Sequence, residues 1–114
     1  MFTVKAKVNS SYRTHYPHPL KLKSGDQVKI EKRKCEWKGW VWCEGKDGNT
    51  GWIPENYLQI KGNNGKLLLD YDATELTVQR GEELKIIKEE SGWFWCKNQK
   101  GDYGWIPKEK LRLR

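Results

Sequence analysis

The sequence has few of the residues that metal sites and covalent cross-links use. Its 114 residues include three cysteines, two histidines and one methionine. No Cys-x-x-Cys spacing occurs and no histidine lies near a cysteine at metal-ligand spacing, so zinc binding and dithiol redox chemistry are not expected. We expect Cys35, Cys43 and Cys96 to be free thiols in a reducing compartment, and we expect no metal and no cofactor.

Long hydrophobic runs are also missing. No window approaches the roughly 20 apolar residues of a membrane span, and the first five residues have no apolar core of a signal peptide. We therefore expect a soluble, cytoplasmic, monomeric protein with no membrane partner. The sequence suggests no Ser-His-Asp or Cys-His arrangement, and it contains no Gly-rich phosphate loop. It is therefore not expected to be an enzyme.

Tryptophan, in contrast, is abundant, and it marks an internal repeat. The chain has seven tryptophans, and the segments 39–43 (Gly-Trp-Val-Trp-Cys) and 51–54 (Gly-Trp-Ile-Pro) recur almost unchanged at 92–96 and 104–107. The recurrence predicts a tandem repeat of one folding unit. We expect a first domain at residues 1–61 (copy one), a polar linker at 62–65 and a second domain at 66–114 (copy two).

The spacing of apolar residues predicts β-strands. Apolar and polar residues alternate, as at Val4, Ala6 and Val8, between turns that contain glycine. Asp47-Gly48 and Lys100-Gly101 are typical of hairpin turns. We expect an all-β protein with five short strands per copy, closed into a small barrel, and a turn of 3₁₀ helix after each Ile-Pro pair.

The segment 51–58 (Gly-Trp-Ile-Pro-Glu-Asn-Tyr-Leu) resembles the closing segment of Src-homology-3 (SH3) domains. Both copies resemble this family, so the likeness covers almost the whole chain. The loop at residues 12–19 is similar to the RT loop of small tandem variant SH3 proteins of prokaryotes. The resemblance implies two tandem SH3-like five-stranded barrels.

Members of the SH3 family bind proline-rich segments in an aromatic groove, because a polyproline II helix is already ordered. The resemblance assigns to such grooves Tyr12, Trp40, Pro54 and Tyr57 in copy one and Tyr71, Trp93 and Pro107 in copy two. In copy one Ser10 replaces one groove tyrosine, and we expect Tyr16 to compensate. In copy two Leu69 and Lys110 replace two tyrosines. We therefore expect copy one to bind an extended protein or peptide segment, with proline-rich ligands as one class.

Charge modifies this expectation. Arg13, His15 and His18 stand where the family has acidic loop residues, which disfavours a ligand with basic flanks in copy one. The RT loop of copy two, from Asp72 to Glu75, is shorter and acidic. Copy two is therefore expected to be chiefly structural, although weak binding of a basic segment stays open.

Strand alternation places Trp40 on the outer face, opposite to Val41 and Cys43. Four further tryptophans flank the hairpin turns and are expected to form outward cross-strand pairs: Trp42 with Trp52, and Trp95 with Trp105. Contact between the barrels, a structural stack under lysine stems such as those of Lys46 or Lys97, and a partner site are the alternatives for these pairs.

The net charge of +7 is unevenly distributed, since residues 1–61 hold twelve basic and six acidic residues and residues 62–114 hold ten and nine. A basic run in copy one consists of Lys29, Lys32, Arg33, Lys34 and Lys38. Basic residues beside aromatic rings are typical of nucleic-acid binding. Besides peptide binding, the alternatives are thus a nucleic-acid site at this run and a purely structural or assembly role.

Overall fold

A computed structural model describes residues 4–14, 19–34 and 38–113. It contains strands and two short 3₁₀ helices. Along the chain these are β1 (Val4–Val8), β2 (Lys21–Leu22), β3 (Gln27–Glu31), β4 (Trp40–Glu44), β5 (Thr50–Pro54), η1 (Glu55–Tyr57), β6 (Leu58–Lys61), β7 (Asn64–Leu67), β8 (Tyr71–Asp72), β9 (Glu83–Glu90), β10 (Trp93–Lys97), β11 (Tyr103–Pro107), η2 (Lys108–Lys110) and β12 (Leu111–Leu113).

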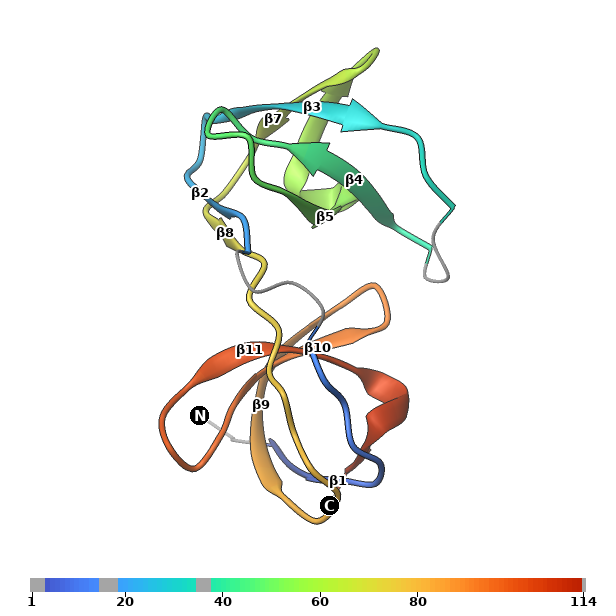
Figure 1. Ribbon diagram of the computed structural model, residues 1–114, viewed down its shortest axis with the longest axis vertical. Coiled ribbons are helices and arrows are strands. Elements are labelled where there is room, and N and C mark those ends of the chain that lie inside the picture. Colours follow the sequence, from blue (N-terminus) through green and yellow to red (C-terminus); the bar gives the residue numbers. More distant parts are fainter. Residues whose placement is uncertain (1–3, 15–18, 35–37, 114) are drawn as a thin grey trace. The chain divides into compact units, whose positions relative to one another are not determined.

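The strands form two compact units (Figure 1). Unit 1 combines Met1–Pro17 with Thr74–Arg114, and unit 2 is the continuous segment His18–Ala73. Unit 1 has a five-stranded sheet in the order β11-β10-β9-β1-β12. Unit 2 has a five-stranded sheet in the order β5-β4-β3-β7-β6 and a small β2-β8 sheet. The predicted all-β fold with two five-stranded SH3-like barrels is confirmed.

The two sequence repeats exchange their first strands. β1 begins copy one, yet it lies in unit 1 between β9 and β12, both of which belong to copy two. β7 begins copy two, yet it lies in unit 2 between β3 and β6 of copy one. In Figure 1 the blue β1 accordingly lies in the same barrel as the orange and red strands β9 to β11. Each barrel is therefore built from both repeats.

The exchanged strands occupy equivalent positions. In unit 1 Ala6 is opposite Leu84 on one side and Leu113 on the other. In unit 2 Gly65 is opposite Val28 and Ile60 in the same way. Alternate residues of each exchanged strand are buried, as a strand with one face in a core requires. The two exchanged strands thus share one pattern of buried alternate residues.

The compact units do not follow the division expected from the repeat, which placed a linker at residues 62–65. In the structure Gly62, with φ of 61°, and Asn63 connect β6 to β7, and Lys61 is opposite Asn64 in the ladder. The predicted linker residues thus form the end of a β-hairpin inside unit 2. Glycine and asparagine suit a tight hairpin turn as well as a flexible connection, so composition alone did not separate the two.

The predicted turns and 3₁₀ helices are present. Gly48 and Gly101 have φ values of 83° and 94° at the tips of the β4–β5 and β10–β11 hairpins, a conformation that favours glycine. The helices η1 and η2 follow Pro54 and Pro107 directly.

The unit 1 core is a single apolar cluster that includes Val8, Val78, Leu84 and Ile106. Cys43 and Cys96 are fully buried free thiols at equivalent places in the two units, as expected. Burial raises the pKa of each thiol to about 12, because the charged thiolate would lose its hydration. Cys35 lies outside the described residues, as do His15 and His18.

Among the described residues no group of three or more His, Cys, Asp or Glu is arranged to hold a metal ion. Within the same residues no helix is long and apolar enough to cross a membrane.

Candidate functional site

Each unit has a tryptophan directly opposite a proline on the neighbouring strand of its sheet. Trp40 on β4 is directly opposite Pro54 on β5, and Trp93 on β10 is directly opposite Pro107 on β11. Paired residues of neighbouring strands project to the same face. Because Cys43 and Cys96 lie in the cores, alternation along each strand directs both tryptophans to the face opposite these thiols.

The strand exchange separates Tyr12 from the tryptophan of its own repeat. Tyr12 belongs to unit 1, where its backbone pairs with Val78. Its ring packs edge-to-face on Trp93, with a centroid distance of 5.9 Å and an interplanar angle of 84°. The Tyr12 hydroxyl donates a 2.6 Å hydrogen bond to Oε1 of Glu75. The structure therefore does not bring Tyr12 together with Trp40 in one unit.

Tyr71 takes the corresponding place in unit 2. Its ring packs edge-to-face on Tyr57, with a centroid distance of 5.4 Å and an angle of 88°. Its hydroxyl donates a 2.8 Å hydrogen bond to the carbonyl oxygen of Trp52. Unit 2 thus collects four of the predicted groove residues, which we call the unit 2 groove set: Trp40, Pro54, Tyr57 and Tyr71. This combination does not follow from the sequence repeat, because a repeat that folded by itself would place Tyr71 in the same barrel as Trp93.

The groove residues are less accessible than expected. Trp40 is 9% exposed and Trp93 is 7% exposed, while Tyr57 and Tyr71 are 6% and 5% exposed. The expectation that the Trp40 ring lies open is wrong for this structure. Alternation along a strand fixes the face to which a side chain projects, but it does not reveal what covers that face. Tyr16, the other predicted groove residue, lies outside the described residues.

The predicted tryptophan pairs are cross-strand neighbours in both units, but one ring of each is buried, with Trp42 7% and Trp105 2% exposed. Trp42 lies opposite Trp52 with ring centroids 5.1 Å apart, and Trp95 lies opposite Trp105 at 5.3 Å. A cation covers one ring of each pair, with the Arg33 guanidinium 4.2 Å from Trp42 and the Lys88 ammonium 5.7 Å from Trp105. These contacts favour a structural stack under basic side chains.

The stack uses other basic residues than those expected. Lys97, one of the two lysines proposed as cover, lies 5.5 Å from the Tyr103 ring. The cations on the tryptophans come from the strand and loop next to each hairpin, Lys88 on β9 and Arg33 after β3.

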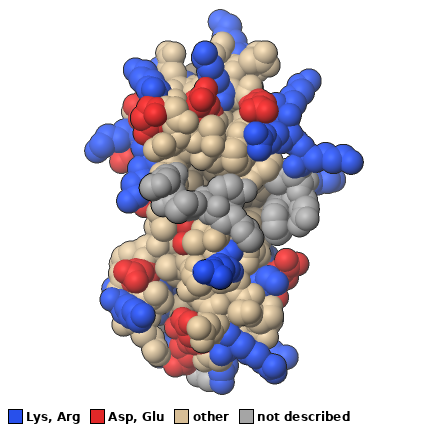
Figure 2. Space-filling model, in the orientation of Figure 1, with Lys and Arg blue, Asp and Glu red and all other residues tan. Residues whose placement is uncertain are grey.

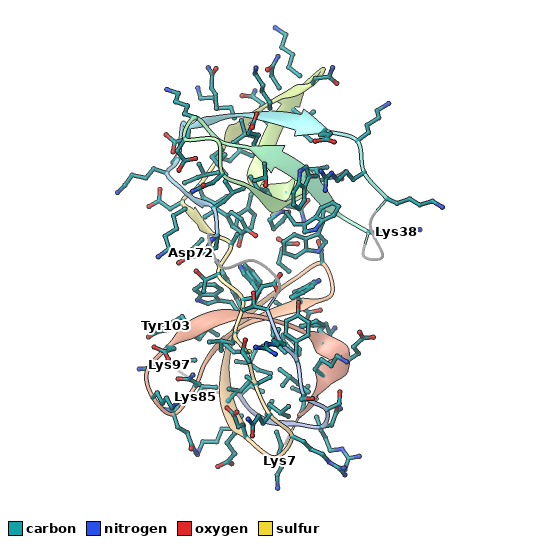
Figure 3. All side chains as sticks on the ribbon, viewed as in Figure 1. Lys7, Lys38, Asp72, Lys85, Lys97 and Tyr103 are labelled. Carbon is teal, nitrogen blue, oxygen red and sulfur yellow. The ribbon has the colours of Figure 1, made fainter. Side chains whose placement is uncertain are left out.

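The basic run of copy one lies on β3 and the segment that follows it. Lys29, Lys32, Lys34 and Lys38 are exposed, and Lys38 projects away from its loop in Figure 3. Glu31 lies 3.5 Å from Nε of Arg33, and carboxylates lie among the basic side chains over unit 2 in Figure 2. The interruption by acidic residues persists in three dimensions, and the nucleic-acid hypothesis for this run stays a prediction.

Comparison with known proteins matches the variant SH3 domain family twice, at residues 5–61 and 66–114. The chain is 25% identical to Intersectin-1 of Xenopus laevis and 24% identical to Intersectin-1 of Mus musculus and of Homo sapiens, over 95% of its length. It spans only 8% of the length of these relatives. No solved structure gives a significant match.

Proposed function

Because the chain belongs to the variant SH3 domain family, we propose that it is a non-catalytic protein-interaction module whose unit 2 binds an extended peptide segment. The observation that carries the proposal is the assembly of the unit 2 groove set from both repeats. Copy one supplies Trp40, Pro54 and Tyr57, and copy two supplies Tyr71 through the exchanged segment. Flat rings beside a proline suit the ridges of a polyproline II helix.

Unit 1 is the poorer candidate for the same function. Tyr12 and Trp93 contact one another there. However, Lys110 stands on η2 where unit 2 has Tyr57 on η1. We therefore assign peptide binding to unit 2 and a structural role to the aromatic residues of unit 1.

The exchange also changes the charge expected beside the groove. Asp72 follows Tyr71 on β8, which pairs with β2 inside unit 2. Arg13 follows Tyr12 and belongs to unit 1. Asp72 thus belongs to the same unit as the unit 2 groove set. It occupies a loop position at which acidic residues of SH3 domains bind basic residues of the ligand. We propose a proline-rich segment with a basic flank as the ligand class.

The low exposure of the groove residues adds a condition. A ligand can contact the Trp40 ring only in states in which that ring, 9% exposed here, becomes accessible. The apparent affinity is then reduced by the fraction of molecules in such states. Binding should therefore perturb the indole N–H resonance of Trp40 strongly.

The test is a titration of the full chain with a proline-rich peptide library, followed at the seven indole N–H signals. Tyr71→Ala should weaken binding of a peptide found in this way by about 2 kcal/mol, a typical loss for a central interface tyrosine. Tyr12→Ala is the matched control, because it removes the equivalent ring from unit 1, and it should leave the affinity unchanged.

Trp40→Ala and Trp93→Ala form a second matched pair. Trp40→Ala in unit 2 should weaken peptide binding, and Trp93→Ala in unit 1 should leave the affinity unchanged. A loss of affinity in Tyr12→Ala but not in Tyr71→Ala would contradict binding at the unit 2 groove set. It would indicate instead that Tyr12 contacts the peptide. Retained affinity in Trp40→Ala would remove the groove assignment altogether.

A further inference from the structure

The outer face of unit 1 carries three lysines in one row. Lys5 on β1 is directly opposite Lys85 on β9, and Lys85 is directly opposite Lys97 on β10. Tyr103 on β11 is opposite Lys97 and ends the row. Figure 3 labels Lys85, Lys97 and Tyr103 along the same side of the barrel. We call Lys5, Lys85 and Lys97 the lysine row.

Within the part of the chain that the structure describes, no carboxylate neutralises the positive charge of the lysine row. None of its three ammonium groups forms an ion pair with a carboxylate of the described residues. Lys100 joins the row in lining a hollow of about 420 Å³, and Glu83 is the acidic residue among the described lining residues. Like charges directly opposite one another destabilise a sheet, so an anion bound here would relieve their repulsion.

An exposed aromatic stack adjoins the lysine row. Tyr103 is 44% exposed, and its ring stacks on Trp95 with an interplanar angle of 19° and a centroid distance of 6.2 Å. The Lys97 ammonium lies 5.5 Å from the Tyr103 ring. The outer side of Tyr103 therefore offers a rigid, flat surface beside cations. Single-stranded nucleic acid is recognised by this combination, in which cations follow the phosphates and rings stack with bases.

Unit 2 shows that the row is not a general property of the fold. The equivalent ladder runs through Asn64 on β7, Lys29 on β3, Glu44 on β4 and Thr50 on β5. It has one lysine, one carboxylate and no aromatic ring. The strand exchange contributes to the difference, because it is the exchanged strand β1 that brings Lys5 into unit 1.

We propose that the lysine row and Tyr103 form a binding site for single-stranded nucleic acid, with phosphates on the ammonium groups and a base stacked on the tyrosine. This site lies in unit 1, on residues other than the basic run Lys29 to Lys38 that the sequence suggested. It involves none of the unit 2 groove set, so it stands or falls independently of peptide binding.

The proposal predicts a selective effect of charge removal. Fluorescence anisotropy with a labelled oligo(dT) strand measures the affinity of the full chain at two salt concentrations. Replacing Lys85 and Lys97 by glutamine should weaken binding about tenfold and lower the slope against salt by about two, since two phosphate contacts are lost. Replacing Lys29 and Lys66 by glutamine removes the same charge from exposed strand positions of unit 2 and should change the affinity less than about twofold.

The tyrosine gives a second test that charge alone cannot explain. Tyr103→Leu keeps an apolar side chain and should weaken binding of the single strand about fivefold or more through lost stacking. Its affinity for a duplex should stay unchanged, because paired bases are not available to the ring. Retained amide NMR spectra of each variant confirm that the barrels are folded.

Several outcomes would overturn the proposal. Equal losses in the two double lysine variants would indicate attraction by net charge alone. A loss only in the Lys29 and Lys66 variant would place the site in unit 2. Equal affinity for duplex and single strand, with no effect of Tyr103→Leu, would exclude base stacking. Binding of polyglutamate with the same dependence on Lys85 and Lys97 would identify an acidic polypeptide as the partner, and absence of oligo(dT) binding would end the proposal.

Discussion

Units 1 and 2 have equivalent strand orders in their five-stranded sheets, but their outer faces differ, and the β9–β10 pairing of unit 1 has a register shift that the β3–β4 pairing of unit 2 lacks. Unit 2 has Tyr57 on η1, 6% exposed, where unit 1 has Lys110 on η2. Unit 1 has the lysine row with Tyr103, where the equivalent ladder of unit 2 has one lysine, one carboxylate and no aromatic ring. Many buried positions are equivalent in the two units, including Cys43 with Cys96 and Ile53 with Ile106. The two units therefore share the arrangement of their cores, whereas the residues on their outer faces differ.

The short segment between Tyr71 and Leu76 in copy two gives a physical reason for the exchange of first strands. In copy two only the segment 72–75 separates Tyr71 from Leu76, and in a self-contained repeat this segment would have to fold back as an RT loop. Short loops under strain favour exchange of an element with an identical partner. With the strands exchanged, the segment instead continues from unit 2 into unit 1, and no tight reversal is needed.

The largest expected effect comes from deleting residues 1–9, which include β1. β1 lies between β9 and β12 in the middle of the unit 1 sheet, and it contributes the fully buried Ala6 and Val8 to the unit 1 core. The deletion should unfold unit 1 and leave unit 2 folded. Amide NMR spectra should lose the dispersed signals of residues 74–113 and keep those of 19–73. Loss of the signals of residues 19–61 instead would show that β1 belongs to the barrel of its own repeat.

A double-mutant cycle provides the control for this deletion without removing a strand. Val8 is opposite Leu111 in unit 1; without exchange, the equivalent neighbour would be Leu58, which is opposite Leu67 in unit 2. Val8→Ala should couple with Leu111→Ala by about 1 kcal/mol, as contacting residues do, and should be additive with Leu58→Ala. The reverse pattern would disprove the exchange.

A smaller difference is expected at an equivalent pair of glycines. A Cβ at Gly104 of unit 1 would lie 2.7 Å from the backbone nitrogen of Leu76. A Cβ at Gly51 of unit 2 would meet the Leu20 side chain first, at 3.3 Å. Backbone cannot yield as a side chain can, so Gly104→Ala should destabilise unit 1 by about 3 kcal/mol and Gly51→Ala should cost unit 2 about 1 kcal/mol or less.

Hydrogen exchange of core amides in each unit measures this difference directly, because each unit supplies its own probes. Equal losses in the two variants would mean that the approach of Leu76 to Gly104 is relaxed in solution.

Local features of the fold were predictable from the sequence because they depend on short-range chemistry. Alternation of apolar and polar residues predicted the strands, and glycines such as Gly48 and Gly101 predicted the hairpin turns. The cross-strand position of Trp42 and Trp52 followed from their symmetric placement about a hairpin. Each of these inferences needs only residues that are close along the chain.

The membership of the barrels and the composition of the site were not predictable in the same way. β1 and β7 share a pattern of buried alternate residues, so alternation by itself does not specify which barrel receives which strand. The place of Tyr71 beside Tyr57, and of Lys5 beside Lys85, follows from that choice alone. The burial of Trp40 was missed because a strand pattern does not report what packs on its outer face.

The smallest expected difference concerns the cations on the two tryptophan pairs. The Arg33 guanidinium lies 4.2 Å from the Trp42 centroid, whereas the Lys88 ammonium lies 5.7 Å from that of Trp105. Arg33→Met, which keeps an apolar stem, should lower the stability of unit 2 by about 0.5–1 kcal/mol, as exposed cation–π contacts do. Lys88→Met should cost unit 1 less, because attraction to the ring weakens with distance.

Chemical denaturation followed by unit-specific NMR signals measures both losses. High salt serves as a control, since it screens the attraction of Arg33 to Glu31 more than its contact with the ring. A loss in Arg33→Met that disappears in high salt would assign the effect to Glu31 instead of Trp42. A larger loss in Lys88→Met than in Arg33→Met would show that the tighter cation contact does not belong to unit 2.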